Sequence, residues 1–447
     1  MTDRSSDRTS VDDVSKATMG EATNNSPSLD AEKGGPPAGV NPWHPSAFPD
    51  GGTEAWLTVL GSFCAMFVSF GWIGAIGAFQ EHYQLNQLKD YSPSQVSWIP
   101  SIEACFMFLG GSWVGRFQDY YGPTWLLPVG TFFHVFGLMM ASLSTKYYQF
   151  ILSQSICSSI GASLLFYPAS SCLATWFMKK RAVAFSIAAC GSSLGGVIFP
   201  IMVRKLIEQI GFGWAMRTCA FVVLVLATIA SFTIKCRIPP TKAPFTAMDF
   251  IRPVTELPFL LLSLAMFLIF CGLFVPFIFM SIEAVSNGMS HNVSIYLVSV
   301  FNGVSILGRT LPAPLADKYG RFNVVIIMSW LTAIFTLAIW IPASSNTARW
   351  LYSAFFGFSS GTIVSMGPAL VAQISDVRQI GIRTGTMYTF VALAVLVGNP
   401  IAGSLVTDHG TNYNRLKIFG GSLMCAGCVV LMAARWSLSN GKLIAKV

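Results

Sequence analysis

An arginine stands inside a long apolar segment of this chain, where a charged side chain is unusual. Arg309 follows Ser305 and Asn302 at helical spacing, so the three side chains share one face of the predicted helix. Charged groups are costly in lipid, which makes each one a candidate functional group. A guanidinium there can bind a carboxylate or an enolate through two parallel hydrogen bonds. We predict that Arg309, Ser305 and Asn302 bind a substrate; the alternative is an arginine that only pairs structurally or extends to the interface.

A carboxyl group stands inside another apolar segment. Glu103 lies about eight residues from the outer end of its segment, roughly 12 Å deep. A carboxyl group away from water can hold and release a proton, so Glu103 is a candidate for proton coupling. Substrate contact and a structural hydrogen bond are the alternatives. Tyr167, Gln154 and Asn399 are further candidates for lining a solute path, whereas His134 fits a packed polar side chain better.

The elements that position these residues must be helices in lipid. Of the 447 residues, 53% are hydrophobic and only 11% are charged, whereas soluble chains carry about 25% charged residues. Segments of about 20 apolar residues, each long enough to span a bilayer, occur twelve times. They lie near 56–79, 96–115, 123–143, 150–174, 182–203, 213–234, 257–281, 292–312, 322–342, 349–372, 384–406 and 417–436. The sequence therefore predicts an all-α membrane protein with twelve transmembrane helices.

The interval after the sixth segment contains Pro239, Pro240 and Pro244, and a spanning helix avoids prolines in series. It divides the chain into two six-helix halves. The predicted parts are a disordered cytosolic tail (1–54), an N-terminal half (55–234), a central cytosolic linker (235–256), a C-terminal half (257–436) and a cytosolic C-terminal tail (437–447). Lys and Arg are more frequent in the connections on one side, which places both termini in the cytosol, with the plasma membrane as the expected location.

A short motif occurs at equivalent positions of the two halves. Asp-x-Tyr-Gly follows the second helix of each half, first at Asp119 and again at Asp317. Each aspartate can accept hydrogen bonds from a helix N-terminus or an arginine of the other half. We predict two latch loops, residues 115–122 and 313–321, that hold the outward-facing state closed at the cytosolic side. Their predicted working residues are Gly115, Arg116, Asp119, Gly122, Asp317, Lys318, Gly320 and Arg321.

The paired motif resembles the signature loop of the major facilitator superfamily, which implies the major facilitator fold. Two further stretches resemble hallmark motifs of its monocarboxylate porter family, and helix 1 is most similar to the fungal branch. The first stretch contains Asp50, Gly51 and Gly52, and the second contains Lys179, Lys180, Arg181 and then Gly191. Gly74 and Ser305 replace charged residues of the proton-coupled animal members. This difference favours a larger amphipathic solute over lactate.

The sequence therefore predicts a secondary active transporter that works by alternating access. The resemblance and the two replacements favour export of a fungal secondary metabolite. Uptake of a monocarboxylate or vitamin-like carboxylate is the alternative, and a non-transporting membrane nutrient sensor is the alternative of another class. Expected partners are a small-molecule substrate, a proton and the lipid bilayer, with no nucleic acid; a monomer is expected.

No catalytic residue, metal site or cofactor is predicted, because motifs for nucleotide, zinc or nucleophilic chemistry are not found in the sequence. The protein is therefore not expected to be an enzyme. Nearly all of the ten cysteines lie within the apolar segments and indicate little, and the C-x-x-C pair Cys425 and Cys428 is interpreted as packing residues, with metal binding or redox chemistry as the alternative. Asn292 begins a glycosylation sequon on a predicted outer loop close to the membrane.

Overall fold

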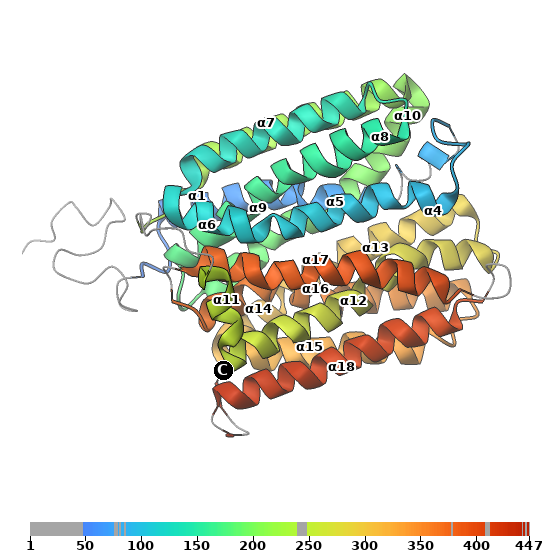
Figure 1. Cartoon of the computed structure of the whole chain (residues 1–447). Helices are drawn as coiled ribbons and strands as arrows, with labels where there is room; N and C mark the ends of the chain where they lie inside the picture. Colours follow the sequence, from blue (N-terminus) through green and yellow to red (C-terminus); the bar gives the residue numbers. More distant parts are fainter. Residues whose placement is uncertain are drawn as a thin grey trace, which may run out of the picture.

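The computed structural model describes residues 48–446 except 76–78, 80, 81, 85, 239–247, 377, 378, 407–411, 440, 443 and 444. Most of the predicted tail 1–54 and part of the linker 235–256 therefore lie outside the described residues. The fold is all-α, and its helices lie side by side along one long direction (Figure 1). The start of α1 and the C-terminus lie at the same end as α6, α11 and α14 (Figure 1).

The N-terminal bundle contains the helices up to residue 233. These are α1 (Thr53–Val68), α2 (Phe70–Ile73), α4 (Pro93–Val96), α5 (Trp98–Leu109), α6 (Gly111–Tyr121), α7 (Pro123–Ala141), α8 (Tyr147–Phe150), the π-helical η3 (Ile151–Ser158), α9 (Ser159–Trp176) and α10 (Arg181–Thr233). Gly211 has a φ of 77° and divides α10 into two antiparallel helices.

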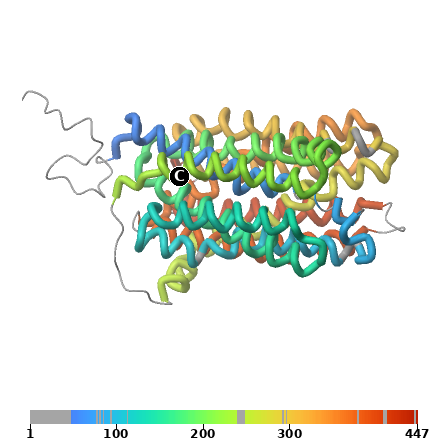
Figure 2. The backbone as a smooth tube through the Cα atoms, turned by 90° about the horizontal axis from the view of Figure 1, so that it is seen from above, coloured from blue at the N-terminus to red at the C-terminus, as the bar shows by residue number. Residues whose placement is uncertain are grey.

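The C-terminal bundle contains the helices from residue 257 onward. These are α12 (Leu257–Ser286), α13 (His291–Thr310), α14 (Pro312–Tyr319), α15 (Arg321–Phe335), the π-helical η4 (Thr336–Trp340), α16 (Asn346–Gln373), α17 (Ile380–Ser404) and α18 (Asn414–Leu438). A short helix of the linker, α11 (Met248–Thr255), lies at the edge of the molecule in the view from above (Figure 2).

The helices reproduce the twelve predicted spans. Nine helical segments of the described chain are long and apolar enough to cross a membrane, and α10 is one of them although it contains two passes. Two more passes are interrupted, the second by Gly110 between α5 and α6 and the eighth by Leu311 between α13 and α14. The twelve helices form the two six-helix halves that the sequence predicts.

Two tight turns connect consecutive spans at the end that carries α6 and α14. Gly122 (φ 76°) ends α6 and Gly320 (φ 109°) ends α14, and the next helix begins one residue later in each case. A residue that carries a Cβ atom rarely adopts such a positive φ, so glycine permits this abrupt reversal of the chain. The two glycines of the repeated motif therefore have the same backbone role in both bundles.

Glycines also allow α2 to approach α10 closely. A Cβ atom on Gly71 would lie 2.8 Å from the Cα atom of Gly195, and one on Gly74 would lie 2.7 Å from that of Gly196. Gly71 and Gly74 therefore permit close packing of the two helices at this point. Gly191 packs similarly, because its Cβ atom would clash with the carbonyl of Phe63 in α1.

One expectation about an individual residue was wrong, and one covalent feature was not predicted. Asn292 was predicted on a loop, but its backbone lies in the first turn of α13; its side chain is outside the described part of the chain. The sequence did not predict a disulfide, but Cys172 at the end of α9 forms one with Cys236 after α10. Cys425 and Cys428 do remain free thiols.

Candidate functional site

The predicted stripe on α13 lies at the seam where the two bundles meet. Asn302 donates through Nδ2 to the carbonyl of Gly196 at 3.4 Å, and the Ser305 hydroxyl lies 2.6 Å from that of Ser193. Both partners belong to α10, so these contacts cross from one bundle to the other. Their side chains are buried, which means that this part of the seam is closed in the structure.

Arg309 continues the stripe toward the end that carries α6 and α14. Its Nη1 donates to the Ala189 carbonyl and the Ser192 hydroxyl, both in α10. The side chain is buried, and its Nε has no hydrogen-bond partner among the described residues. An unpartnered guanidinium N–H in a buried position is unfavourable. Arg309 is therefore the group at this seam with an unused capacity to bind an anion.

Two further predicted residues, Tyr167 on α9 and Asn399 on α17, differ in how their polar atoms are used. The Tyr167 hydroxyl donates to the Phe108 carbonyl at 2.8 Å, so its polar atom is already occupied within the N-terminal bundle. Asn399 is buried on α17, and its Oδ1 has no partner in the described part of the chain. Asn399 thus has an unsatisfied acceptor, whereas Tyr167 offers mainly its ring.

Glu103 is enclosed by neutral hydrogen-bond donors. Its carboxylate accepts from the Trp72 indole at 2.8 Å and from Nε2 of Gln154 at 2.9 Å. Gln154 is oriented in turn by Tyr83, whose hydroxyl donates to its Oε1 at 2.6 Å. Gln154 lies in the π-helical segment η3, and π-helical turns are frequent at functional sites. Within the described region, none of the ion pairs involves Glu103.

The C-terminal bundle contains a buried glutamate with cationic partners, which sequence reasoning missed. Glu283 on α12 accepts from Lys417 on α18 at 3.0 Å and from Nε of Arg349 on α16 at 3.4 Å. The Trp340 indole of η4 also donates to it, at 3.4 Å. Arg349 and Lys417 are themselves buried. The two buried glutamates therefore differ, one having neutral and the other charged partners.

His134 contacts a break in the first span. Its Nε2 lies 2.9 Å from the carbonyl of Val68, where α1 ends, and its Nδ1 lies 2.8 Å from the Ser158 hydroxyl. Both ring nitrogens are thus occupied by neutral groups, and the ring is buried. These contacts fit the interpretation of His134 as a packed polar side chain.

Each of the two latch loops contacts the bundle to which it does not belong. Asp119 accepts from the backbone N–H groups of Gly381 and Ile382 at 3.2 and 2.9 Å, at the N-terminus of α17. Asp317 accepts from those of Ala182 and Val183 at 3.1 Å each, at the N-terminus of α10. Each aspartate therefore binds the positive end of a helix from the other bundle.

The remaining latch residues support these contacts. Gly115 lies so close to α17 that a Cβ atom would clash with the Gly381 carbonyl. Arg321 pairs with Asp317 at 2.8 Å and donates to the Met178 carbonyl at 2.7 Å, while Arg116 pairs with Asp249 of α11 at 3.4 Å. Lys318 is exposed, with its ammonium over the ring of Tyr319.

The two family motifs, far apart in sequence, contact each other. Oδ1 of Asp50 accepts from the backbone N–H groups of Met178, Lys179 and Lys180 at 2.7–3.0 Å, just before α10 begins. The side chains of Lys179 and Lys180 are exposed, but Arg181 is buried and donates to the carbonyl of Ala372 in the C-terminal bundle at 3.0 Å. A Cβ atom on Gly51 would have no neighbouring atom within 4 Å, so packing does not require glycine there. Gly52, just before α1, has a φ of 92°, which favours glycine.

The sequence matches the profile described as Major Facilitator Superfamily over residues 58–283 and again over residues 262–440. The chain belongs to the Major Facilitator Superfamily. It is a multi-pass membrane protein and a transporter, and members of this superfamily are normally not enzymes.

Relatives within the Major Facilitator Superfamily match almost the whole chain. MFS-type transporter 1 of an Ophiocordyceps species is 48% identical over 418 residues, covering 94% of this chain and 93% of the relative. The fujikurins efflux protein of Gibberella fujikuroi is 42% identical over 402 residues, covering 90% and 86%. Their names do not specify monocarboxylate porters, so membership of that branch stays a prediction.

The fold of this superfamily member is also found among solved structures. The crystal structure of the human organic anion transporter MFSD10 (TETRAN) has a TM-score of 0.64 and 14% identity, covering 85% of this chain and 98% of that one. At this level of identity the likeness is one of fold.

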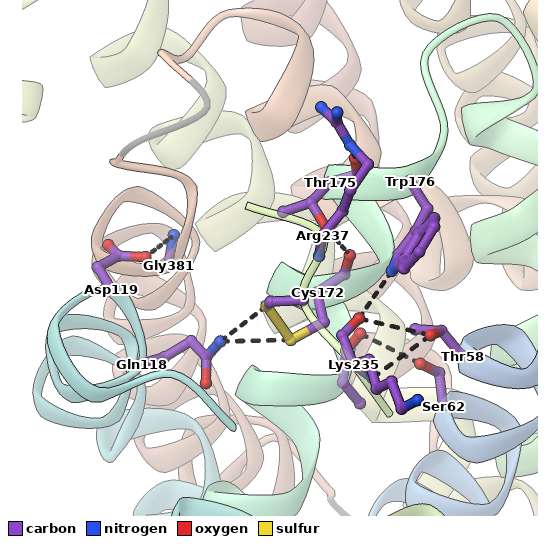
Figure 3. The surroundings of a disulfide bond; sticks show 12 residues. Thr58, Ser62, Gln118, Asp119, Cys172, Thr175, Trp176, Lys235, Arg237 and Gly381 are labelled. Atoms are coloured by element: carbon purple, nitrogen blue, oxygen red, sulfur yellow. Dashed lines mark hydrogen bonds between the residues drawn. A yellow bond between two sulfur atoms is a disulfide. The ribbon is translucent and has the colours of Figure 1, made fainter. Parts of the chain in front are cut away.

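The disulfide of this transporter lies beside the latch loop of the N-terminal bundle. Figure 3 shows Nε2 of Gln118 donating to the sulfurs of Cys172 and Cys236, each at 3.3 Å. Gln118 directly precedes Asp119, which binds Gly381 in the same view. The chain after α10 is also fastened by the Trp176 indole, which donates to the Lys235 carbonyl at 2.7 Å. The disulfide thus joins a segment that non-covalent contacts already fix.

Weakening one latch aspartate of the transporter should open the seam at that end. Asp119→Asn removes the charge from two hydrogen bonds and should raise the rate at which N-ethylmaleimide labels Cys190 about tenfold. Cys190 reports on the seam because its thiol lies beside the Ile306 carbonyl of α13. Peptide mass spectrometry would measure the rate, with Cys219, buried within the N-terminal bundle, as the internal control. Equal increases at both cysteines would indicate general unfolding and contradict a latch role.

Acid should weaken a contact at the same end of the C-terminal bundle. Nη1 of Arg383 donates to Glu256 at 2.7 Å, and this hydrogen bond and charge lower the pKa of Glu256 below its ordinary 4.5. A lowered pKa gives stability that is present above the unfolded-state pKa and lost as pH falls through the folded-state value. The midpoint temperature of thermal unfolding should therefore decrease as the pH is lowered below about 4.5. Glu256→Gln should reduce that acid-dependent fall, and an unchanged profile would exclude the pair as a cause.

Proposed function

We propose that this transporter exports a small amphipathic organic acid, of the kind made in fungal secondary metabolism, by alternating access. The observation that carries the proposal is the 42% identity to a fujikurins efflux protein along 90% of this chain. Arg309 supports an acidic cargo, because it is a buried cation at the seam with an unpartnered N–H. Asn302, Ser305, Tyr167 and Asn399 are proposed as further substrate contacts.

The closed seam is proposed to be one state of the transport cycle. Residues 55–234 and 257–436 would move as two rigid halves, and the latch contacts of Asp119 and Asp317 would break when the end that carries them opens. We propose that this end is cytosolic, that both termini lie there, and that the protein works in the plasma membrane as a monomer. A seam that opens and closes around one central site is the usual mechanism of such folds.

The proposal is tested by deleting the gene in its source organism and profiling small molecules in cells and medium by mass spectrometry. Export predicts that at least one organic acid falls in the medium and rises in the cells, and that the wild-type gene restores both levels. A compound that instead accumulates unused in the medium would support the alternative, uptake of a carboxylate nutrient. Unchanged profiles in both compartments would contradict transport of either kind and favour a sensor.

Glu103 is proposed to couple transport to a proton. Its partners are neutral, so protonation leaves no buried cation without a counter-charge. In inside-out vesicles loaded with the compound that the deletion identifies, Glu103→Gln should abolish accumulation driven by a pH gradient while exchange without a gradient persists. Glu208→Gln, which removes an exposed carboxyl group of the same bundle, is the control for the loss of a carboxyl group as such. Full gradient-driven accumulation by Glu103→Gln would exclude this role.

A further inference from the structure

A tyrosine of the C-terminal bundle is enclosed by three aromatic rings of the N-terminal bundle. Tyr388 on α17 is stacked on Phe108 of α5, with ring centroids 5.6 Å apart and an interplanar angle of 8°. Its edge-to-face neighbours on α9 are Phe166 at 5.4 Å and Tyr167 at 6.0 Å. All four side chains are at most 2% exposed. We call Phe108, Phe166 and Tyr167 the aromatic cage.

The phenol oxygen, which is the polar end of the Tyr388 side chain, lies within electrostatic range of a buried cation. The guanidinium of Arg309 interacts electrostatically with the Tyr388 phenol. The two residues lie on α13 and α17 of the same bundle, whereas the cage belongs to the other. Tyr388 therefore has its ring in an aromatic site of one bundle and its acidic oxygen within the field of a buried cation of the other.

Ordinary core packing does not require this arrangement, as a second tyrosine of the same bundle shows. Tyr352 is equally buried and is stacked on Trp340, with ring centroids 5.2 Å apart and an angle of 6°. Trp340, like Tyr352, belongs to the C-terminal bundle, so that contact stays intact when the bundles separate. The contacts of Tyr388 with the cage instead break on separation and expose the ring surfaces that Tyr388 covers, while Phe70 of the N-terminal bundle stays packed on Phe108 and Phe166.

We infer that Tyr388 occupies, in this closed state, the site that takes the ring of the transported molecule. The inference rests on the proposed function and specifies its substrate class: a planar conjugated ring carrying a weakly acidic oxygen of the phenol or enol type. Such a ring fits the cage because aromatic faces and edges prefer stacked and edge-to-face neighbours. Its oxygen, once ionised, is bound by Arg309, whose Nε is unpartnered. The substrate then bridges both bundles, as Tyr388 does in the closed state.

The inference predicts that removing Tyr388 improves the binding of a small planar phenol. A side chain that fills a site reduces the apparent affinity of a ligand by the fraction of time it occupies that site. Equilibrium dialysis of the purified full-length chain in lipid nanodiscs with 7-hydroxycoumarin should therefore show about tenfold tighter binding to Tyr388→Ala than to wild type. Tyr388→Leu, which retains more volume and is less disruptive to folding, should show a gain in the same direction.

Two controls make the result specific. Tyr352→Ala removes an equally buried ring away from the seam and should leave the affinity unchanged. 7-Methoxycoumarin has the same ring system without the acidic oxygen, so its affinity for Tyr388→Ala should exceed its affinity for wild type by less than about threefold. Equal gains for both coumarins, an equal gain for Tyr352→Ala, or absence of coumarin binding to both Tyr388 variants would overturn the inference. Because binding is measured without transport, an export defect on gene deletion would stand even if the cage were refuted.

Discussion

Replacing Glu283 with leucine is expected to destabilise the transporter by about 3–5 kcal/mol, the largest stability effect among these predictions. The reason is that Glu283 is the acidic partner of two buried cations, Lys417 at 3.0 Å and Arg349 at 3.4 Å. Removing it leaves both positive charges in a low-dielectric interior without a counter-charge. Chemical denaturation in detergent, followed by tryptophan fluorescence, would measure the change in unfolding free energy.

Glu103→Leu is the matched control for this prediction. Glu103 is also buried and also bonds to a tryptophan indole, but its partners are neutral, so its loss should cost only about 1–3 kcal/mol. Adding Lys417→Met to Glu283→Leu removes one orphaned cation and should recover part of the lost stability. If Glu283→Leu costs no more than Glu103→Leu, then the ion pairs do not stabilise the C-terminal bundle.

Replacing Arg309 with alanine is expected to reduce export at least about 100-fold, the largest functional effect. Two charge-assisted hydrogen bonds to an acidic substrate contribute about 1.5–3 kcal/mol each, and each 1.4 kcal/mol corresponds to a factor of ten. Arg309→Lys keeps the charge but not the fork of N–H donors, so it should retain a small part of the activity. The measurement is initial export of the compound identified by gene deletion.

Ser192→Ala separates substrate binding from packing at the seam. In the closed state Arg309 donates to the Ser192 hydroxyl and the Ala189 carbonyl, so part of its role is to join the bundles. Ser192→Ala removes one of those contacts and leaves the guanidinium in place. A loss of export as large as that of Arg309→Ala would assign the arginine to closure instead of the substrate.

The overall fold could be predicted because each span is a local pattern. Twelve apolar runs, one proline-containing interval and a repeated Asp-x-Tyr-Gly motif are all visible within short windows of sequence. The spacing of Asn302, Ser305 and Arg309 likewise predicts a shared helix face without knowledge of the neighbouring helix. The roles assigned to these residues remain predictions.

The partners of these residues could not be predicted, because they come from distant parts of the chain. Glu283 and Lys417 are 134 residues apart, and Cys172 and Cys236 are 64 residues apart. No local pattern indicates which helices will be neighbours in a bundle, so neither the ion pairs of Glu283 nor the disulfide could be predicted.

Gly74 and Ser305 show that a missing charge in the sequence can have more than one physical reason. Their lack of charge suggested a change of cargo, but the structure adds a packing reason. Gly74 permits contact with Gly196, and the Ser305 hydroxyl meets that of Ser193 across the seam. A charged side chain at either position would separate α10 from its neighbours.

The latch aspartates bind main-chain donors, and this choice affects how the transporter can evolve. Asp119 and Asp317 bind N–H groups at residues 381, 382, 182 and 183, which every amino acid except proline supplies. Mutations along α10 and α17 can therefore remodel the side chains near the seam without removing the partners of the latch, except at Gly381, where a Cβ atom would clash with Oδ1 of Asp119. Cargo preference and closure are thus encoded separately, so relatives can diversify in what they carry while inheriting one mechanism of closing.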